Sequence, residues 1–229
     1  MANDWAHVKQ LLKEACRETL NTLRSKHPTE RFYAFALYDA DDAYCVGPSA
    51  NSESGYEKKL RYFTERMNET DGHFRNWTKK LYPNGCNYSV LPRWSTTEWV
   101  YEGVEFGPFE EARQLLEAMS TSQAGDDFYV RQARSFGTSV LALKELSDEG
   151  FFGAGDSRIV SFFSVSDNRD APWLELESAR RINPPDPFAK LEPELRLMST
   201  LIYGLDAHPS PELVAAFERV HGSWWNATA

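Results

Sequence analysis

The sequence contains few cysteines and no long apolar run, and both absences exclude classes of protein. Its three cysteines are Cys16, Cys45 and Cys86. Their number is odd and no C-x-x-C pair occurs, so we expect neither a disulfide framework nor a zinc site. No stretch approaches the roughly 20 apolar residues that cross a bilayer. Because the amino-terminal residues MANDWAHVKQ also lack the apolar core of a secretory signal, we expect a cytoplasmic protein with no membrane partner.

Positive charge is also scarce. The chain has 25 Lys and Arg residues against 34 Asp and Glu residues, which gives a formal net charge of -9. No run of Lys or Arg is long enough to form a basic patch. Since an acidic surface repels phosphate backbones, we expect no nucleic-acid partner. A basic protein partner would be attracted instead.

Motifs for catalysis and metal binding are missing as well. The five histidines are scattered without an H-x-H or H-E-x-x-H pair, and no serine lies in a G-x-S-x-G turn. No phosphate-binding loop occurs. The segment Gly153-Ala154-Gly155 precedes an expected strand and lacks the third glycine of a dinucleotide fingerprint, so it predicts a turn. The sequence therefore predicts no metal, no cofactor and no assignable catalytic residue.

Aromatic residues, by contrast, are abundant at 14% of the chain, and they mark two expected strands. Residues 31–38 (RFYAFALY) are apolar on both alternating faces, which indicates a central strand buried on both sides. Strict alternation predicts one face with Phe32, Ala34, Ala36 and Tyr38, and the other with Tyr33, Phe35 and Leu37. Residues 158–165 (RIVSFFSV) predict the second strong strand. Shorter strands are expected over residues 43–46, in a hairpin with the first, and over 88–91. The Gly, Pro, Ser and Asn content of residues 47–54 predicts a loop.

Apolar residues at three- and four-residue spacing predict the helices. The expected helices span residues 3–25, 54–67, 109–119, 127–146, 170–182, 187–203 and 211–221. No repeat or linker divides the chain. We therefore predict a single α+β domain over residues 1–229, with a small, mainly antiparallel sheet covered by six or more helices. A doubly wound sheet is the second choice, because strands and helices do not alternate regularly.

The segment RWSTTEW, from Arg93 to Trp99, is the densest group of chemically useful side chains. Ser95 and Glu98 have the S-x-x-E spacing of a capping box, and Trp94 and Trp99 have the spacing of a hydrophobic staple. A helix start would thus explain the segment. The functional alternative is a cleft lined by Arg93, Glu98 and Glu102 under a tryptophan roof, with the two carboxylates on one helix face. We predict that Arg93 is partly buried and paired with a carboxylate.

Polar residues near the ends of expected strands complete the candidate site. Asp39, Asp41 and Asp42 follow the central strand, where a solvated hairpin turn explains them and a partner-facing acidic patch is the functional alternative. They lack the glycine and glutamate of a calcium-binding loop. The full set of candidate binding residues is Asp39, Asp41, Asp42, Asn51, Glu53, Arg93, Trp94, Glu98, Trp99 and Glu102.

Three segments together resemble a known family. They are FYAFALYDADDAYCVGPSANSES, RWSTTEWVYEG and FFSVSDNRDAPWLELESARRINPP, in that order. The chain resembles the uncharacterised, mainly bacterial proteins catalogued as domain of unknown function 4303. The resemblance covers about residues 31–187, with C-terminal helices following over 187–221. It implies a single domain, and it supplies no established activity and no assigned catalytic residue.

Three functional hypotheses follow. The first is a non-enzymatic protein-binding module of the bacterial cytoplasm, in particular an immunity protein that neutralises a basic toxin domain. The net charge and the aromatic residues favour it, because acidic surfaces speed association and aromatic side chains anchor interfaces. The second is an enzyme of unknown reaction type, whose cleft is lined by Asn51, Glu53, Arg93, Glu98, Glu102 and Asp167. The third treats these residues as helix caps and ion pairs that bind no ligand.

Overall fold

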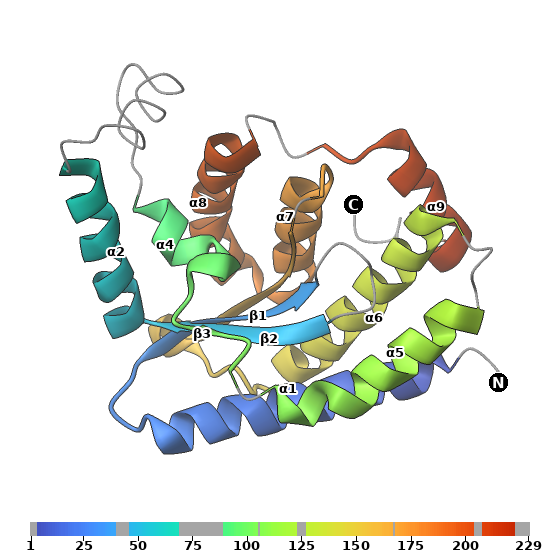
Figure 1. Cartoon of the computed structure of the whole chain (residues 1–229), viewed down its shortest axis with the longest axis horizontal. Coiled ribbons are helices and arrows are strands. Elements are labelled where there is room, and N and C mark those ends of the chain that lie inside the picture. Colours follow the sequence, from blue (N-terminus) through green and yellow to red (C-terminus); the bar gives the residue numbers. More distant parts are fainter. Residues whose placement is uncertain are drawn as a thin grey trace.

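Four strands of the described residues form a mixed sheet through the middle of the molecule (Figure 1). The computed structural model describes residues 4–39, 46–68, 89–104, 106–122, 127–166, 168–203 and 208–222. The sheet order is β3 (Tyr101–Glu102), β2 (Val46–Ser52), β1 (Phe32–Asp39), β4 (Val160–Val165). β1 is antiparallel to β2 and parallel to β4, and β2 is antiparallel to β3. The α+β class and the central position of the RFYAFALY strand are confirmed.

Helices cover both faces of this sheet (Figure 1). The α-helices of the described ranges are α1 (Trp5–Lys26), α2 (Glu53–Asn68), α4 (Val90–Trp94), α5 (Glu110–Ser122), α6 (Phe128–Asp148), α7 (Ala171–Ile182), α8 (Pro185–Tyr203) and α9 (Pro211–His221). Short 3-10 helices are η1 (Thr96–Glu98), η2 (Gly107–Phe109) and η3 (Gly155–Ser157). All seven expected helices are present, and α4 was not predicted. Within the part of the chain that the structure describes, no helix has both the length and the apolar character required to cross a membrane.

The sheet separates two hydrophobic cores. The larger core lies between one face of the sheet and α1, α5, α6 and α9, and it includes Phe35, Leu37 and Phe163. The smaller core lies on the other face, against α4 and α8, and it includes Ala36 and Phe162. α7 contributes side chains to both cores. Burial on both faces explains why β1 is apolar throughout and does not alternate with polar residues.

A β-bulge at the start of β1 changes which side chains face the smaller core. Phe32 pairs with Ser52 and Ala34 pairs with Asn51, so Tyr33 is an extra residue on β1. Tyr33 and Ala34 therefore both contribute to the smaller core, although they are consecutive. The sequence prediction, which placed Phe32 with Ala34 and Tyr33 with Phe35, is wrong at this point because a bulge reverses the alternation.

Two other local predictions are wrong. Residues 47–54 were expected to form a loop, but β2 runs from Val46 to Ser52 and all seven of its residues are buried. Small side chains suit this strand because neighbouring groups approach closely: a Cβ on Gly47 would lie 2.5 Å from the Phe106 ring. The helix expected from Ser54 starts at Glu53, with the hydroxyl of Ser52 accepting from the Gly55 amide at 3.1 Å.

Residues 88–91 were expected to be a strand, but α4 begins at Val90.

The outer edge of β4 is closed by side chains of α7 and of its C-cap residue, Asn183. Asn183 accepts from the Ser161 amide at 3.0 Å and donates to the Ser161 carbonyl at 2.7 Å. The Ser178 hydroxyl accepts from the Phe163 amide at 2.9 Å. These bonds occupy backbone groups that a neighbouring strand would otherwise use, so α7 takes the place of a fifth strand.

Candidate functional site

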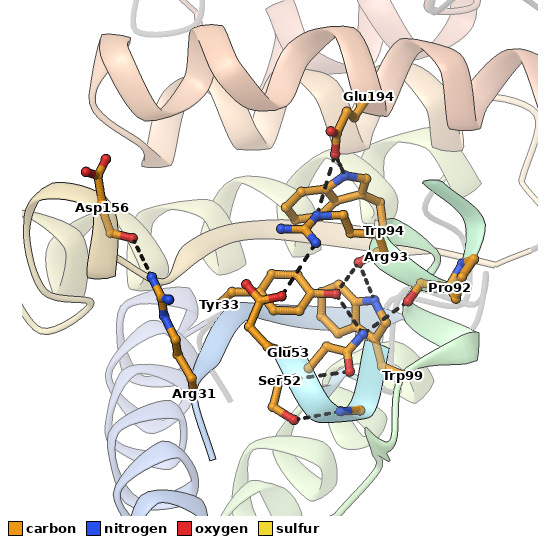
Figure 2. Close-up of polar contacts among 12 residues, drawn as sticks. Arg31, Tyr33, Ser52, Glu53, Pro92, Arg93, Trp94, Trp99, Asp156 and Glu194 are labelled. Carbon is orange, nitrogen blue, oxygen red and sulfur yellow. Dashed lines mark hydrogen bonds and ion pairs between the residues drawn. The ribbon is translucent and has the colours of Figure 1, made fainter. Parts of the chain in front are cut away.

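A cleft of about 670 Å³ opens at the end of the sheet where β1 and β4 begin and β2 ends. Its walls are α4, the first half of α8 and the segment around η3, and the start of α2 lies at its edge. Figure 2 shows Arg93, Trp94 and Glu194 on one side of it and Arg31 with Asp156 on the other. The lining residues are Arg31, Phe32, Tyr33, Glu53, Arg93, Trp94, Ala154, Gly155, Asp156, Ser157, Arg158, Val160, Pro184, Pro185, Asp186, Pro187, Lys190, Leu191 and Glu194.

Arg93 is held in this cleft by aromatic rings and carboxylates. Its guanidinium carbon lies 4.7 Å from the ring centroid of Tyr33, 5.0 Å from that of Tyr56 and 5.5 Å from that of Trp94. Its Nη1 lies 3.6 Å from Oε2 of Glu53, and its Nε lies 3.7 Å from Oε2 of Glu194. The side chain is 28% exposed. The prediction that Arg93 is partly buried and paired with a carboxylate is therefore confirmed, with ion-pair distances longer than those of direct hydrogen bonds.

The two tryptophans of RWSTTEW are buried, and each has a hydrogen-bond partner for its indole nitrogen. Trp94 donates to the Glu194 carboxylate, and Trp99 donates to the carbonyl of Arg93 at 3.0 Å. The Trp94 ring meets Tyr33 edge to face at 5.6 Å, and the Trp99 ring meets Phe162 in the same way at 5.6 Å. Both rings thus help to build the smaller core, and Trp94 also forms one wall of the cleft.

The predicted capping box is wrong. Trp94 is the last residue of α4, and Ser95 makes no side-chain cap to the 3-10 helix that follows. The Glu98 amide bonds to the Ser95 carbonyl at 3.0 Å, and the Glu98 carboxylate turns to Lys59 at 3.3 Å. The segment is thus a helix end followed by a single 3-10 turn, in which both tryptophans are buried in the smaller core.

Beneath the cleft, buried hydrogen bonds fix the position of α4. Asn51 is fully buried, and its side-chain nitrogen donates to the Tyr33 hydroxyl at 2.9 Å and to the Pro92 carbonyl at 3.1 Å. The Tyr33 hydroxyl in turn donates to the Arg93 carbonyl at 2.9 Å. Burial raises the pKa of the Tyr33 phenol, so it remains a neutral donor. The bulge at Tyr33 therefore connects the central strand directly to the backbone that presents Arg93.

The mouth of the cleft carries charges that are more exposed. Lys190 and Asp156 form an ion pair at 3.4 Å, and their side chains are 78% and 95% exposed. Arg31 donates to the Asp156 carbonyl at 3.5 Å. Arg158, which also lines the cleft, donates to the Gly153 carbonyl at 3.0 Å and to the Ser147 hydroxyl. These rim charges are open to water and salt, and they interact more weakly than the inner group.

The structure brings only part of the predicted site together. Glu53, Arg93 and Trp94 line the cleft, and Asn51 and Trp99 support it from below through hydrogen bonds. Glu98 and Glu102 do not line it. Partial burial, and then the neighbouring Glu98 carboxylate, raise the pKa of Glu102.

The acidic residues after the central strand do not belong to this site either. Asp39 lies at the opposite end of β1 from the cleft, where its carboxylate accepts from Ser135 at 3.3 Å. Asp41, Asp42 and Asp167 lie outside the described residues. The six residues of the enzyme hypothesis therefore do not form one lining set among the residues that the structure describes.

Residues that the sequence did not single out complete the cleft. Glu194 and Lys190 come from α8, and Asp156 comes from the segment before β4. Lining positions on α8 are Pro185, Asp186, Pro187, Lys190, Leu191 and Glu194. The last four have the three- and four-residue spacing of one helix face. That spacing was visible in the sequence, but nothing local indicated that this face meets Arg93, which lies about 100 positions earlier in the chain.

The described residues thus define an α+β protein with a mixed-charge cleft whose centre is an arginine enclosed by aromatic rings and two glutamates. No group of three or more potential metal ligands occurs in these ranges. The family model for Domain of unknown function (DUF4303) matches residues 12–184, about three quarters of the chain, and the protein belongs to this family. No curated protein and no solved structure matches it.

Proposed function

We propose that the protein is a non-enzymatic binding module, and that its cleft receives a segment of a protein partner. The observation that carries this proposal is the composition of the cleft. Aromatic and proline side chains line it together with charged groups that are already placed by contacts within the chain. A concave, largely apolar surface with a few convergent polar groups is typical of binding sites. Groups fixed in advance also lower the entropic cost of binding.

The charge of the whole chain supports a basic partner. A net charge of -9 accelerates the approach of a positively charged protein and slows that of a negatively charged one. In its specific form, the proposal is that the protein is an immunity protein of the bacterial cytoplasm that neutralises a basic toxin domain. Binding would then be sufficient for function, because a toxin whose active site is covered is inactive.

Site-directed photo-crosslinking in the native host tests the proposal. A photoreactive phenylalanine analogue replaces Lys190, which is exposed at the mouth of the cleft. The matched control places the same analogue at Glu117 on α5, which lies across the sheet from α8 (Figure 1). We expect one basic protein to be crosslinked from position 190 and none from position 117. Expression of that protein alone should slow growth, and co-expression with the wild-type chain should restore it.

Two outcomes would contradict the proposal. One is the absence of any protein-sized adduct at position 190 under conditions in which the analogue reacts with added peptide. The other is an adduct that forms equally from positions 190 and 117. The variant Arg93→Ala separates cleft binding from contact elsewhere, because it should abolish the adduct at position 190.

A further inference from the structure

The inner end of the cleft carries an excess of negative charge. Among the described residues, Glu53 and Glu194 are the carboxylates that pair with Arg93, which lies between them, as Figure 2 shows. The group thus has a net charge of one negative unit. The cleft lining also carries charges outside this group, namely Arg31, Asp156, Arg158, Asp186 and Lys190. Lys190 and Asp156 pair with each other and are largely exposed, so their effect on the inner end is reduced by water and salt. Arg31 and Arg158 donate to backbone carbonyls, those of Asp156 and Gly153.

Both carboxylates retain capacity for another hydrogen-bond donor. The Glu53 and Glu194 side chains are 38% and 43% exposed, against 28% for Arg93. Glu53 accepts no hydrogen bond from the described residues, and its pairing with Arg93 is loose at 3.6 Å. Glu194 uses Oε2 both for the Trp94 indole and for Arg93, which leaves Oε1 available. A carboxylate offers about four lone-pair sites, so each glutamate is only partly satisfied.

Arg93 itself is poorly placed to receive an anion. Three aromatic rings surround its guanidinium, and the carboxylates of Glu53 and Glu194 stand on two sides of it. An anion that reached Arg93 would lie close to both carboxylates and would be repelled by them. A cation in the same place would neutralise the excess charge. The sign of the ligand is therefore set by the two glutamates.

We infer that the inner end of the cleft recognises a cationic side chain, an arginine or a lysine, through the Glu53 and Glu194 carboxylates; this inference rests on the proposed function, in which a basic protein partner supplies that side chain. Arg93 acts as a fixed spacer, which holds the two carboxylates apart while their outer oxygens receive the incoming cation. Pro184, Pro185 and Pro187 make part of the cleft lining stiff, because proline has little freedom to rearrange.

A titration followed by nuclear magnetic resonance tests this inference on the whole chain. The probes are Nα-acetyl-arginine amide, its neutral isostere Nα-acetyl-citrulline amide, and Nα-acetyl-glutamate amide. The observed signal is the indole N–H of Trp94, which reports on Glu194 because it donates to that carboxylate. At low ionic strength we expect the arginine probe to bind with a dissociation constant on the order of 1 mM, as ligand-efficiency limits suggest. The citrulline and glutamate probes should bind at least about tenfold more weakly.

Conservative variants locate the binding. Glu53→Gln and Glu194→Gln each remove one negative charge and keep an acceptor oxygen, and each should weaken the arginine probe about tenfold. The matched control is Glu192→Gln, which makes the same charge change on the same helix at a residue that pairs with Arg196 and does not line the cleft. This control should leave the dissociation constant unchanged.

Equal binding of the arginine and citrulline probes would overturn the inference, as would equal weakening by Glu192→Gln and Glu194→Gln. These results are distinct from failure of the proposed function. If the arginine probe binds as expected while position 190 crosslinks to no protein, the recognition chemistry holds and the protein-binding role fails. If a partner crosslinks while the glutamate variants bind the arginine probe as the wild type does, the inference alone fails.

Discussion

Glu175 is a carboxylic acid in a place from which water is excluded. It lies on α7, and its residue is only 5% exposed. Ser164 of β4 donates to its Oε1 at 2.6 Å, and Thr96 of η1 donates to the Ser164 hydroxyl at 3.0 Å. Burial raises the pKa of Glu175 to about 8, from an ordinary value of 4.5, and the bond from Ser164 opposes this only in part. The side chain is thus neutral in the folded protein at pH values where it ionises in the unfolded chain.

The raised pKa predicts a stability that falls as pH increases. Between about pH 4.5 and 8 the folded state keeps a proton on Glu175 that the unfolded state releases. The free energy of unfolding should therefore decrease over this window by up to ~1.4 kcal/mol per pH unit, and level off above it. Urea unfolding at pH 5, 6.5 and 8 measures this. The variant Glu175→Gln cannot ionise, so its stability relative to the wild type should rise by a few kcal/mol from pH 5 to pH 8.

Glu192→Gln on the exposed face of α8 controls for the loss of a negative charge. Its stability relative to the wild type should change little over the same range, because an exposed pair contributes at most about 1 kcal/mol. A stability difference between Glu175→Gln and the wild type that did not depend on pH would contradict the assignment.

The sequence could indicate single site residues but not their partners. Arg93, Trp94 and Glu53 were predicted as binding residues because they are charged or aromatic and lie in or next to apolar segments. Glu194 was not, because an exposed-looking glutamate on an amphipathic helix is ordinary. Its contact with Trp94 and Arg93 depends on how α8 packs against α4, which no local pattern of residues specifies.

At the scale of elements, the edge of β4 is closed by side-chain hydrogen bonds whose contribution to stability can be measured. Asn183→Ala would leave the Ser161 amide and the Ser161 carbonyl without these bonds, and it would remove one of the donors to the Ala179 carbonyl. Since each buried polar group left unsatisfied costs about 1–3 kcal/mol, we expect a loss of about 2–4 kcal/mol in the free energy of unfolding. Hydrogen exchange at the Ser161 amide should accelerate together with it.

The matched control for this edge is Ser157→Ala in the exposed segment before β4. Its hydroxyl also donates to a backbone carbonyl, that of Ala154 at 3.1 Å, but in contact with water. It should change stability by no more than about 0.5 kcal/mol. If Asn183→Ala proved equally harmless, the closure of β4 by α7 would be incidental.

The contact between α6 and α9 depends on the absence of a side chain at Gly137. A Cβ at this position would lie 2.3 Å from Cε1 of His221, and His221 is held by a bond from its Nε2 to the Ala133 carbonyl at 2.8 Å. Gly137→Ala should therefore destabilise the protein by about 1–3 kcal/mol, although alanine favours a helix by about 1 kcal/mol. In a His221→Ala background the clash is gone, and the same change should stabilise the protein by up to about 1 kcal/mol. Thermal unfolding of the four proteins gives the coupling, and an equal effect of Gly137→Ala in both backgrounds would contradict the close contact.

Long apolar elements were predictable, whereas elements made of small or mixed residues were not. The helix over Pro211–His221 was predicted with its observed bounds, because Ser210 caps it, Pro211 starts it and Gly222 ends it. The strand β2 was missed because its residues, Val46–Ser52, include glycine, proline, serine and asparagine, which usually form turns. Its neighbours β1 and β3 decide its conformation, so tertiary packing overrides local preference there.

At the scale of the whole molecule, one sheet supports two cores, and this arrangement raises the question of whether they fold together. The larger core contains residues of four helices that lie across the sheet from the cleft, and the smaller core forms the floor of the cleft. β1 and β4 contribute side chains to both. Loss of either core would therefore expose one face of β1 and β4, so these paired strands couple the two cores.

Adjacent phenylalanines of β4 allow the two cores to be perturbed separately. Phe162 packs against Trp99 in the smaller core, and Phe163 packs against Phe136 in the larger one. Phe162→Ala and Phe163→Ala should each lower the free energy of unfolding by about 3–5 kcal/mol. Because the cores share β1 and β4, we expect far-UV circular dichroism and tryptophan fluorescence to give coincident urea transitions in both variants. Should either variant fail to fold, Phe162→Leu and Phe163→Leu provide milder versions of the same pair. A fluorescence transition at lower urea than the loss of helix, in the Phe162 variant alone, would mean that the cleft side of the molecule unfolds by itself, and the cleft would then have to be regarded as a separate, less stable unit.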